Sequence, residues 1–418
     1  MALPPVDRRT PRPVSVCATL LVFAMSLPVY ASAQSVRVLL AQEAPYVEVR
    51  SDSEIILVAP GGSVRARAPL IVSVAGAGMA INGKNVGGDQ VEVRPSRAAL
   101  SLAFPKTLST VSGKSKPAGP AGLAPVETAP GMPVSGIVRI ARRGKGLSAI
   151  NVVDLEEYVK GVVPSEVSAS WHPEMLKVQA VAARTYALYN KHLSAVREYD
   201  LVATVQDQVY RGRLGVDRRV EQAVDQTRGL VVTYQNAPIY AAFSSTAAGP
   251  TEDSMNVWAK DLPYLKGVEC PFDLGSPYYQ WKASVKMDRL EQHLREQGFS
   301  VGTIATITPI AYSRAGRVTT LRILHSRGEL LLRGEDLRKA VGYSVIPSTQ
   351  FEIESVGADV VFAGYGAGHA VGLCQWGAKE LAELGYPFTS ILRYYYPGTE
   401  LRNAAVTTLA SPPPAVVR

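Results

Sequence analysis

Residues 154–193 read DLEEYVKGVVPSEVSASWHPEMLKVQAVAARTYALYNKHL, and the rest of the chain is best understood from this stretch. Two segments with helical periodicity flank a short break at Pro164, and one carboxylate, Glu166, lies in that break. The second helix is predicted to begin near Pro173, because proline fits the first helical position, where no N–H is needed. A glutamate held between two packed helices loses part of its solvation, which raises its pKa and suits it to acid catalysis. These residues alone also allow Glu166 to cap the next helix or to face water.

The predicted second helix carries both polar and small side chains. Gln179 and Tyr186 are two turns apart and therefore share one face. Alanines such as Ala180, Ala183 and Ala187 let another element approach the helix closely. The pattern predicts a packed helix that offers polar groups to the surroundings of Glu166.

The composition is that of an ordinary globular protein. The chain has 418 residues, of which 47 % are apolar, so about two domains with large cores are expected. The formal charge of +8 favours an anionic partner such as cell-wall polymer, nucleic acid or a membrane surface. Lys and Arg are too dispersed to choose among these partners, since no run of them is longer than two.

Residues 1–33 resemble a secretory signal. Arg8, Arg9 and Arg12 precede an apolar core, Val14–Val29, that is short for a membrane span. Ala31-Ser32-Ala33 supplies the small residues of a cleavage site, so export to the periplasm or cell-wall space with cleavage after Ala33 is predicted. An uncleaved membrane anchor is the alternative.

The cysteines leave a question open. Cys17 lies in the segment predicted to be removed, which leaves Cys270 and Cys374. Two cysteines can pair in an oxidising compartment, and two free, buried thiols are the alternative. The sequence does not show whether they lie close together.

The sequence predicts an α+β fold in which mixed β-sheets pack against helices. Residues 34–104 contain short strand-like runs between Gly-containing turns and form a small β-rich N-terminal unit. Residues 105–136 hold six prolines, five glycines and no aromatic residue, so they are interpreted as a linker or insertion. An ordered loop is the alternative, since its flanks could belong to one sheet. Residues 137–402 form the larger catalytic region, and residues 403–418 are predicted to be a disordered tail.

A glycine-rich turn, GYGAGH at residues 364–369, follows a predicted strand and precedes a helix predicted from about Cys374 to Leu384. A dinucleotide-binding fingerprint would need glycine at the position of His369 and an acidic residue after a second strand. Neither requirement is met. The glycines are instead expected to let this backbone pass close to another segment or to a ligand.

An ordered set of short motifs resembles the sporulation stage II protein D family (SpoIID/LytB). In chain order the motifs are LEEYVKGVVPSEV, LKVQAVAARTYAL, QVYRG, TRGLVVTY, FSSTAAGPTED, PYLKGV, LRGEDLRKAVG, PSTQF, GYGAGHAVGLCQWGAKELAELGY and ILRYYYPGTEL. They span roughly residues 137–401, and the ordered set is specific although each motif alone is weak. The strand predicted at Val36–Leu40 also resembles the first strand of the family.

This resemblance implies a cell-envelope enzyme. Well-understood members are lytic transglycosylases that cut the glycan strands of peptidoglycan, with a preference for strands without stem peptides. Their catalytic acid is the Glu of the PSE motif, which falls on Glu166 here. Neutral Glu166 would protonate the oxygen between N-acetylmuramic acid (MurNAc) and N-acetylglucosamine (GlcNAc), and the 6-hydroxyl of MurNAc would close on its anomeric carbon. Other glycosidases use a second carboxylate, and no motif pairs one with Glu166.

The resemblance also implies substrate-binding residues. Arg184 of the AARTY motif either orients Glu166 or binds substrate, and a surface arginine is the alternative. Further candidates for contacts with the glycan are Gln179, Ser244, Ser245, Thr246, Tyr365, His369 and Gln375. Trp376 and Tyr394 could stack on sugar faces, although packing in the core is the commoner role of aromatic residues.

No metal and no cofactor are expected. Some family members bind zinc through His and Cys near the serine–threonine loop, but here that loop, Phe243–Asp253, contains neither. The loop also has Ala248 where the family usually has glycine. The added methyl group would narrow a groove or shift a backbone donor.

Two other functions stay open at this point. The protein could be a non-catalytic glycan-binding modifier that stimulates an N-acetylmuramoyl-L-alanine amidase, although the presence of Glu166 argues against this. A thiol peptidase built on Cys374 and His369 is disfavoured, because no orienting Asn or Asp is evident. The expected partners are peptidoglycan glycan strands and other wall hydrolases such as an amidase. No nucleic-acid partner is expected, and no transmembrane segment once the signal is removed.

Overall fold

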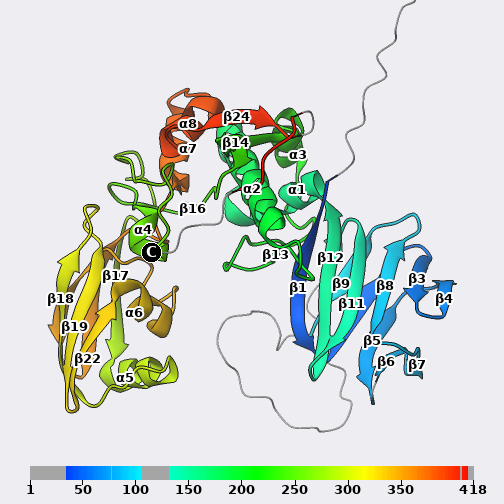
Figure 1. The fold of residues 1–418 in the computed structure, drawn as a ribbon, viewed down its shortest axis with the longest axis horizontal. Helices are drawn as coiled ribbons and strands as arrows, with labels where there is room; N and C mark the ends of the chain where they lie inside the picture. The colour runs from blue at the N-terminus through cyan, green and yellow to red at the C-terminus, as the bar shows by residue number, and fades with distance from the viewer. Residues whose placement is uncertain (1–33, 77, 106–130, 405–406, 413–418) are drawn as a thin grey trace, which may run out of the picture. The chain divides into compact units, whose positions relative to one another are not determined.

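The computed structural model describes residues 34–76, 78–105, 131–404 and 407–412 (Figure 1). The predicted signal segment of residues 1–33 lies outside the described residues. So does most of the predicted linker, residues 106–130, together with 405–406 and 413–418 of the predicted tail. The described part combines several β-sheets with helices, which confirms the predicted α+β class.

Two sheets form a sandwich in the N-terminal part of the described chain (Figure 1). In spatial order, the first sheet consists of β13 (Leu201–Val202), β1 (Ser35–Ala44), β12 (Gly146–Asp154), β11 (Ile137–Arg143), β8 (Gln90–Pro95), β3 (Ile55–Ala59) and β4 (Gly62–Ala66). The second consists of β10 (Met132–Val134), β9 (Leu100–Ala103), β2 (Tyr46–Arg50), β5 (Leu70–Ala75), β6 (Gly78–Ile81) and β7 (Lys84–Asn85). Alternate side chains of both sheets, such as Val72, Leu102 and Ile140, are buried in one shared core.

The first sheet crosses the predicted boundary near residue 137. Strand β1 pairs antiparallel with β12, from Ser35 opposite Asp154 to Ala44 opposite Leu147, and β8 pairs with β11. Strands β9 and β10, which flank residues 106–130, are neighbours in the second sheet. The flanks of the predicted linker therefore belong to one sheet, which is the arrangement that the sequence left open as an alternative.

Three helices follow the sandwich. Helix α1 (Leu155–Glu166) begins where β12 ends, and Asp154 caps it by accepting hydrogen bonds from the N–H groups of Glu156 and Glu157. Helix α2 (Pro173–Leu193) begins at Pro173, which confirms the predicted start. Helix α3 (Arg218–Gln226) is capped by Asp217.

The predicted break at Pro164 is wrong. Helix α1 continues through Pro164 and ends at Glu166. A proline in a helix removes one N–H donor, and here it lies in the last turn. The Ser165 hydroxyl donates to the carbonyl of Gly161 at 3.0 Å, and the Val167 N–H donates to Val163 at 3.0 Å. These bonds complete the last turn, so Glu166 is a helix terminus and not a loop residue.

A second hydrophobic core, separate from that of the sandwich, surrounds helix α2. The helix packs against α1, α3, α7 (Gln375–Glu383), α8 (Phe388–Tyr395) and β14 (Leu230–Tyr234). Strand β14 pairs with β15 (Ala237–Pro238) and β24 (Glu400–Asn403). Ala180, Ala183 and Ala187 of α2 are fully buried, as predicted for a helix that other elements approach closely. None of the helices in the described residues is both long and apolar enough to cross a membrane.

Apolar side chains from residues 281–362 form a third core. One sheet consists of β17 (Gln280–Lys286), β22 (Asp359–Tyr365) and β21 (Phe351–Val356), and another of β18 (Ile304–Tyr312), β19 (Val318–His325) and β20 (Gly328–Arg333). Helices α5 (Met287–Glu296) and α6 (Gly334–Val341) pack against each other. Leu290, Leu294 and Leu337 of these helices join apolar side chains of both sheets.

Strands β16 (Phe243–Ser244) and β23 (Leu373–Cys374) pair in parallel and bring two predicted motifs together. Strand β16 opens the serine–threonine loop, and β23 follows the glycine-rich turn. In that turn Gly368 has φ +103°, and a Cβ there would lie 2.4 Å from the Cβ of Ser244. The glycines thus let two segments pass closely, as the sequence predicted.

Candidate active site

Glu166 is the partly buried last residue of α1. Its Oε1 accepts a hydrogen bond from the backbone N–H of Val209 at 2.7 Å. Burial raises the pKa of Glu166 to about 7, and the Val209 N–H acts in the opposite direction without cancelling it. The carboxyl group also stands at the negative end of the helix dipole, which further disfavours its ionised form. The side chain can therefore hold a proton near neutral pH and give it up.

The segment that carries Val209 is fixed on both sides of that residue. Gln208 accepts a hydrogen bond from the Tyr158 hydroxyl at 3.0 Å, and the Tyr210 hydroxyl donates to Asn151 at 2.9 Å. Gln208 is completely buried, and its Nε2 has no hydrogen-bond partner in the described parts of the chain. These contacts hold the Val209 N–H against Glu166.

A second carboxylate, Asp207, lies in the same neighbourhood. Asp207 and Glu166 both act electrostatically on Tyr158, whose pKa is raised mainly by burial. Asp207 accepts hydrogen bonds from the Tyr186 hydroxyl at 2.9 Å and from the Val202 N–H at 2.7 Å. Both of its oxygens are thus used to hold the segment that leads to Val209. Tyr186 is therefore linked to Glu166 indirectly, because it binds Asp207 and the same segment carries Val209.

Gly161 explains how residues 202–212 come so close to α1. A Cβ at Gly161 would lie 2.2 Å from the Gly212 carbonyl and 2.6 Å from the Tyr210 ring. We expect Gly161→Ala to push this segment away from Glu166 and to lower the free energy of unfolding by ~1–3 kcal/mol, measured by urea denaturation. Gly275→Ala is the control, because a Cβ there meets no atom within 4 Å, and its effect should stay within ~0.5 kcal/mol. Equal stabilities of the two variants would contradict the close approach.

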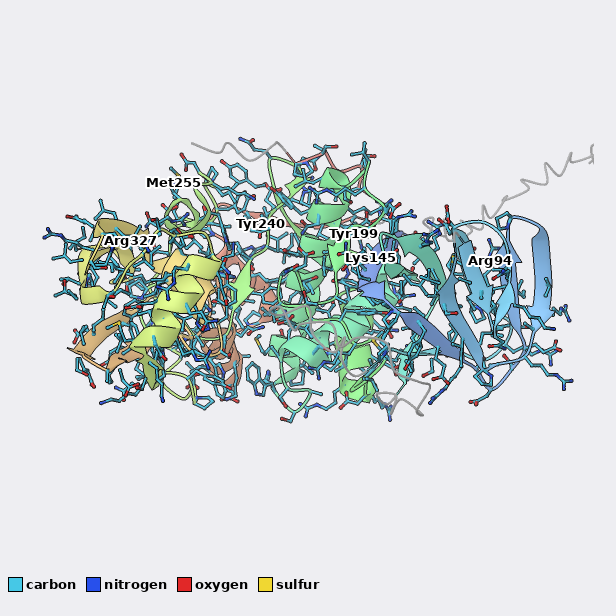
Figure 2. All side chains as sticks on the ribbon, turned by 90° about the horizontal axis from the view of Figure 1, so that it is seen from below. Arg94, Lys145, Tyr199, Tyr240, Met255 and Arg327 are labelled. Carbon is cyan, nitrogen blue, oxygen red and sulfur yellow. The ribbon has the colours of Figure 1, made fainter. Side chains whose placement is uncertain are left out.

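His369 lies at the end of a chain of aromatic contacts that starts on α2. The rings of Tyr186 and Tyr240 are 5.3 Å apart, and Trp258 of α4 (Ser254–Trp258) lies 5.3 Å from Tyr240 and 4.9 Å from His369 (Figure 2 labels Tyr240). Nδ1 of His369 accepts a hydrogen bond from the Val371 N–H at 2.9 Å. Burial, with help from two arginines, lowers the pKa of His369 to about 3. His369 is therefore neutral and serves the turn rather than proton transfer.

Arg184 is buried and contacts neither Glu166 nor the surface, so none of its three predicted roles describes its position. Its side chain is fully buried and forms a two-point ion pair with Glu156, with N···O distances of 2.9 and 2.7 Å. It also donates to the carbonyls of Leu230 and Val224. Arg184 is thus neither a surface residue nor a contact of Glu166. It ties the start of α1 to α3 and β14.

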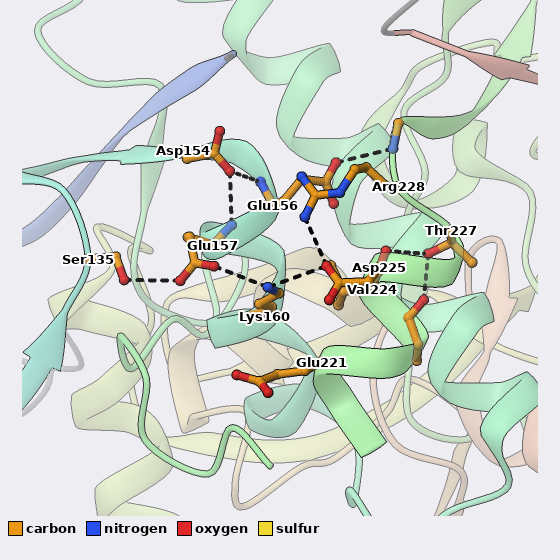
Figure 3. Close-up of polar contacts among 12 residues, drawn as sticks. Ser135, Asp154, Glu156, Glu157, Lys160, Glu221, Val224, Asp225, Thr227 and Arg228 are labelled. Atoms are coloured by element: carbon orange, nitrogen blue, oxygen red, sulfur yellow. Dashed lines mark hydrogen bonds and ion pairs between the residues drawn. The ribbon is translucent and has the colours of Figure 1, made fainter. Parts of the chain in front are cut away.

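Glu156 belongs to a polar cluster around the start of α1 (Figure 3). It also accepts a hydrogen bond from the Gly229 N–H at 3.2 Å. Next to it, Lys160 bridges Glu157 at 3.2 Å and Asp225 at 3.4 Å, and Arg228 pairs with Asp225 at 2.9 Å. This cluster joins α1 to α3 and lies at the opposite end of α1 from Glu166.

Of the three hydroxyl residues predicted to bind substrate, only Ser245 has a partly exposed side chain. Ser244 is buried and its Oγ accepts the Ala370 N–H at 3.1 Å. Thr246 is fully buried and shares a 2.6 Å hydrogen bond with Ser276. The prediction for Ser244 and Thr246 is corrected, because their hydroxyls are used inside the protein. Ser245 stays a candidate.

Gln179 and Gln375 meet in the interior. The Gln375 amide donates to Gln179 at 3.2 Å, and both side chains are buried. No described residue forms a hydrogen bond with the Nε2 of Gln179. Beside this pair, the rings of Trp171 and Trp376 contact each other edge to face at 5.0 Å. The start of α7 is therefore joined to the α1–α2 hairpin that carries Glu166.

Two of the predicted tyrosines are at the surface. Tyr365 is 41 % exposed, and its ring lies 6.3 Å from that of Tyr279. Tyr394 is 37 % exposed, and its hydroxyl donates to the Glu269 carbonyl at 2.6 Å. Both rings keep a face that a sugar could reach.

Sequence reasoning missed one cluster of reactive side chains. Cys270, Asp273 and Cys374 are all buried, and one potential ligand atom from each lies within 4.8 Å of the others. The expectation of no metal was drawn from the serine–threonine loop, which does not contain these residues. Cys374 contacts Asp273 rather than His369, so the structure gives no support to a thiol peptidase.

Comparisons with known proteins agree with the motifs. A family model described as stage II sporulation protein (SpoIID) matches residues 143–234, which contain Glu166 and helices α1 to α3. Stage II sporulation protein D of Bacillus amyloliquefaciens is 34 % identical over 271 residues, which cover 61 % of this chain and 76 % of that protein. The chain belongs to the stage II sporulation protein D family. The predicted resemblance is confirmed.

Other matches place the chain within this family. Stage II sporulation protein D of Bacillus subtilis is 31 % identical over 271 residues, with 61 % of this chain and 76 % of that protein covered. An amidase enhancer of Bacillus subtilis is 31 % identical over 290 residues. This match covers 59 % of the chain but only 40 % of the enhancer.

Residues 270–372, which include the third core, match a model described as a domain of unknown function (DUF8618).

Proposed function

We propose that this SpoIID-family protein is a lytic transglycosylase that cleaves the bond between MurNAc and GlcNAc in peptidoglycan. The observation that carries the proposal is Glu166, a partly exposed residue, where burial raises the pKa of the carboxyl group to about 7. Such a group is protonated in mildly acidic to neutral solution and can act as a general acid. Activity on wall polymer also requires export, which the N-terminal segment predicts.

In the proposed reaction, Glu166 gives its proton to the oxygen that links MurNAc to GlcNAc as the C1–O bond breaks. The 6-hydroxyl of the same MurNAc attacks C1 and forms the 1,6-anhydro ring. The proton of this hydroxyl passes to Glu166, which restores the acid. Because the nucleophile belongs to the substrate, one carboxyl group is sufficient, and Asp207 stays engaged with Tyr186 and Val202.

The Val209 N–H has a role in this cycle. It donates to Oε1 of Glu166 and so stabilises the carboxylate that exists between the two proton transfers. It also fixes the orientation of the side chain. The predicted residues whose side chains are partly or largely exposed, and which can therefore contact the glycan in this proposal, are Ser245, Tyr365, His369, Trp376 and Tyr394.

Product analysis tests the proposal directly. The purified protein is incubated with intact peptidoglycan and with glycan strands stripped of stem peptides, and the new ends are identified by mass spectrometry. New 1,6-anhydro-MurNAc ends are expected. New reducing ends would indicate a hydrolase, and released peptides a peptidase or amidase; either result would contradict the proposed reaction.

The pKa of Glu166 predicts the pH dependence of the reaction. The acid must be protonated, so the rate should be highest below about pH 7 and fall about tenfold per pH unit well above it. Initial rates of anhydro-end formation between mildly acidic and alkaline pH measure this profile, with circular dichroism to verify that the fold persists. A rate that stays constant through neutral pH would contradict proton donation by Glu166.

Similarity to an amidase enhancer supports a second candidate function, a glycan-binding stimulator of an amidase. This function would not need the proton of Glu166. Stimulation of a purified N-acetylmuramoyl-L-alanine amidase, without anhydro ends from the protein alone, would favour it over the transglycosylase.

A further inference from the structure

We propose that Cys270, Asp273 and Cys374 form a zinc site that fastens the last sequence motif to the segment of residues 270–273. Each of the three residues is only 1 % exposed, and their potential ligand atoms all lie within 4.8 Å of one another. Two thiolates and a carboxylate are a donor set that favours Zn²⁺, because soft sulfur ligands select it over Mg²⁺ or Ca²⁺.

The ligand atoms of the cluster, all within 4.8 Å of one another, are near enough to share one ion. Zn–S bonds of about 2.3 Å and Zn–O bonds of about 2.0–2.2 Å place neighbouring ligand atoms roughly 3.5–3.8 Å apart. The Sγ of Cys374 lies 3.2 Å from Oδ2 of Asp273. Small side-chain shifts are enough to admit the ion.

Asp273 supplies an independent observation. Its Oδ2 accepts the Ala248 N–H at 2.8 Å, but its Oδ1 is buried and has no hydrogen-bond partner among the described residues. Leaving a buried carboxylate oxygen unpartnered is unfavourable, and coordination to a cation removes the penalty. An atom of this kind beside two thiols points to a metal.

The charge balance around the cluster agrees with this assignment. Zn²⁺ with two thiolates and one carboxylate carries a single negative charge. Arg317 is buried and interacts electrostatically with Cys374 and Asp273. Within the part of the chain that the structure describes, two of its guanidinium nitrogens have no hydrogen-bond partner. Its remaining nitrogen donates to the carbonyl of Ala247, whose N–H donates to Cys374 Sγ at 3.3 Å. The arginine thus provides the opposite charge next to the proposed site.

The ion would join residues 270–273 to Cys374, and hydrogen bonds to the ligand atoms would hold the serine–threonine loop beside them. Cys374 caps α7 and accepts the Gly377 N–H at 3.4 Å, while Ala247 and Ala248 come from the serine–threonine loop. A Cβ at Gly377 would lie 2.3 Å from the Tyr395 hydroxyl and 2.6 Å from Cys270 Sγ, so only glycine lets α7 close over the cluster. The Tyr395 hydroxyl lies 3.2 Å from Cys270 Sγ, at the edge of the cluster. None of the three proposed ligands lies in the loop that carries zinc ligands in some family members.

Metal analysis of the purified protein tests the site without reference to activity. We expect one zinc per chain by elemental mass spectrometry, and thiolate-to-cobalt charge-transfer absorption after exchange with Co²⁺. Removal by chelator should lower the melting temperature by at least about 5 °C, and added zinc should restore it. Two free thiols in a protein that binds neither zinc nor cobalt would overturn the proposal. So would a Cys270–Cys374 disulfide, seen as an intact mass lower by two hydrogens.

Variants locate the ion. Cys374→Ser and Asp273→Asn should each reduce zinc content at least tenfold, whereas Glu269→Gln, an exposed acid next to Cys270, should retain one zinc. If Cys374→Ser does not fold, the cobalt spectrum of Asp273→Asn decides, because loss of one oxygen ligand must weaken or shift the thiolate bands. Full zinc content in both folded variants would place the ion elsewhere and refute this ligand set.

Discussion

Glu166→Gln should reduce the release of anhydro products by ~10²–10⁴, the usual contribution of a general acid. Glutamine keeps the size of the side chain and offers an amide oxygen to the Val209 N–H, but it has no proton to transfer. Binding to glycan should persist, because the amide oxygen still accepts the Val209 N–H and the side chain keeps its size. The measurement is the initial rate of anhydro-end formation by variant and wild type at equal concentration.

The same substitution should change stability in a pH-dependent way. The pKa of Glu166 is raised on folding to about 7 from an ordinary value of 4.5, so the folded protein binds this proton more tightly than the unfolded chain does. The stabilisation that comes from this tighter proton binding is fully present below pH 4.5 and is lost as the pH rises through 7. Glutamine does not titrate, so the variant should be more stable than wild type by ~1–3 kcal/mol at pH 8, with less advantage at pH 5.

A carboxylate outside the site provides the control. Glu221→Gln on α3 makes the same chemical change at a partly exposed residue that pairs with Arg213, and it should leave the product release unchanged. Urea denaturation of all three proteins at both pH values separates loss of the acid from loss of the fold. If folded Glu166→Gln releases anhydro ends at the wild-type rate, Glu166 is not the acid.

The sequence predicted the parts of the fold that depend on local chemistry. Proline at a first helical position located the start of α2 at Pro173, and the buried alanines of α2 follow from its spacing of small residues. Glycines in the turn at residues 364–369 indicated a close passage of two segments, and the structure shows Gly368 against Ser244. Each of these features depends on residues that are only a few positions apart in the sequence.

What the sequence could not predict depends on partners that are distant in the chain. Arg184 was interpreted without knowledge of Glu156, 28 residues away, and Cys374 without Asp273, 101 residues away. The Val209 N–H is a backbone group, so no side chain marks it as a contact of Glu166. At Pro164 the local rule failed, because a proline in the last helical turn displaces little of the hydrogen-bond ladder.

Arg184→Met should lower the free energy of unfolding by ~3–5 kcal/mol, because it leaves Glu156 buried without its cation. Glu156 is 7 % exposed, and of the contacts that its carboxylate makes with described residues, the hydrogen bond from the Gly229 N–H would remain to stabilise its charge. Methionine fills much of the same space, so the loss reflects the unpaired charge more than a cavity. Urea denaturation at pH 7 measures it.

The double variant Arg184→Met/Glu156→Gln distinguishes charge from packing. If the unpaired carboxylate causes the loss, removing its charge should recover a large part of the stability, since breaking one side of a buried pair costs more than removing both charges. The exposed pair between Arg228 and Asp225, with side chains 57 % and 49 % exposed, is the matched comparison, and Arg228→Met should cost only ~0–1 kcal/mol. If Arg184→Met costs as little stability as Arg228→Met, the ion pair between Arg184 and Glu156 does not hold α1 to α3 and β14. Other contacts would then have to fix the position of Glu166 at the far end of α1.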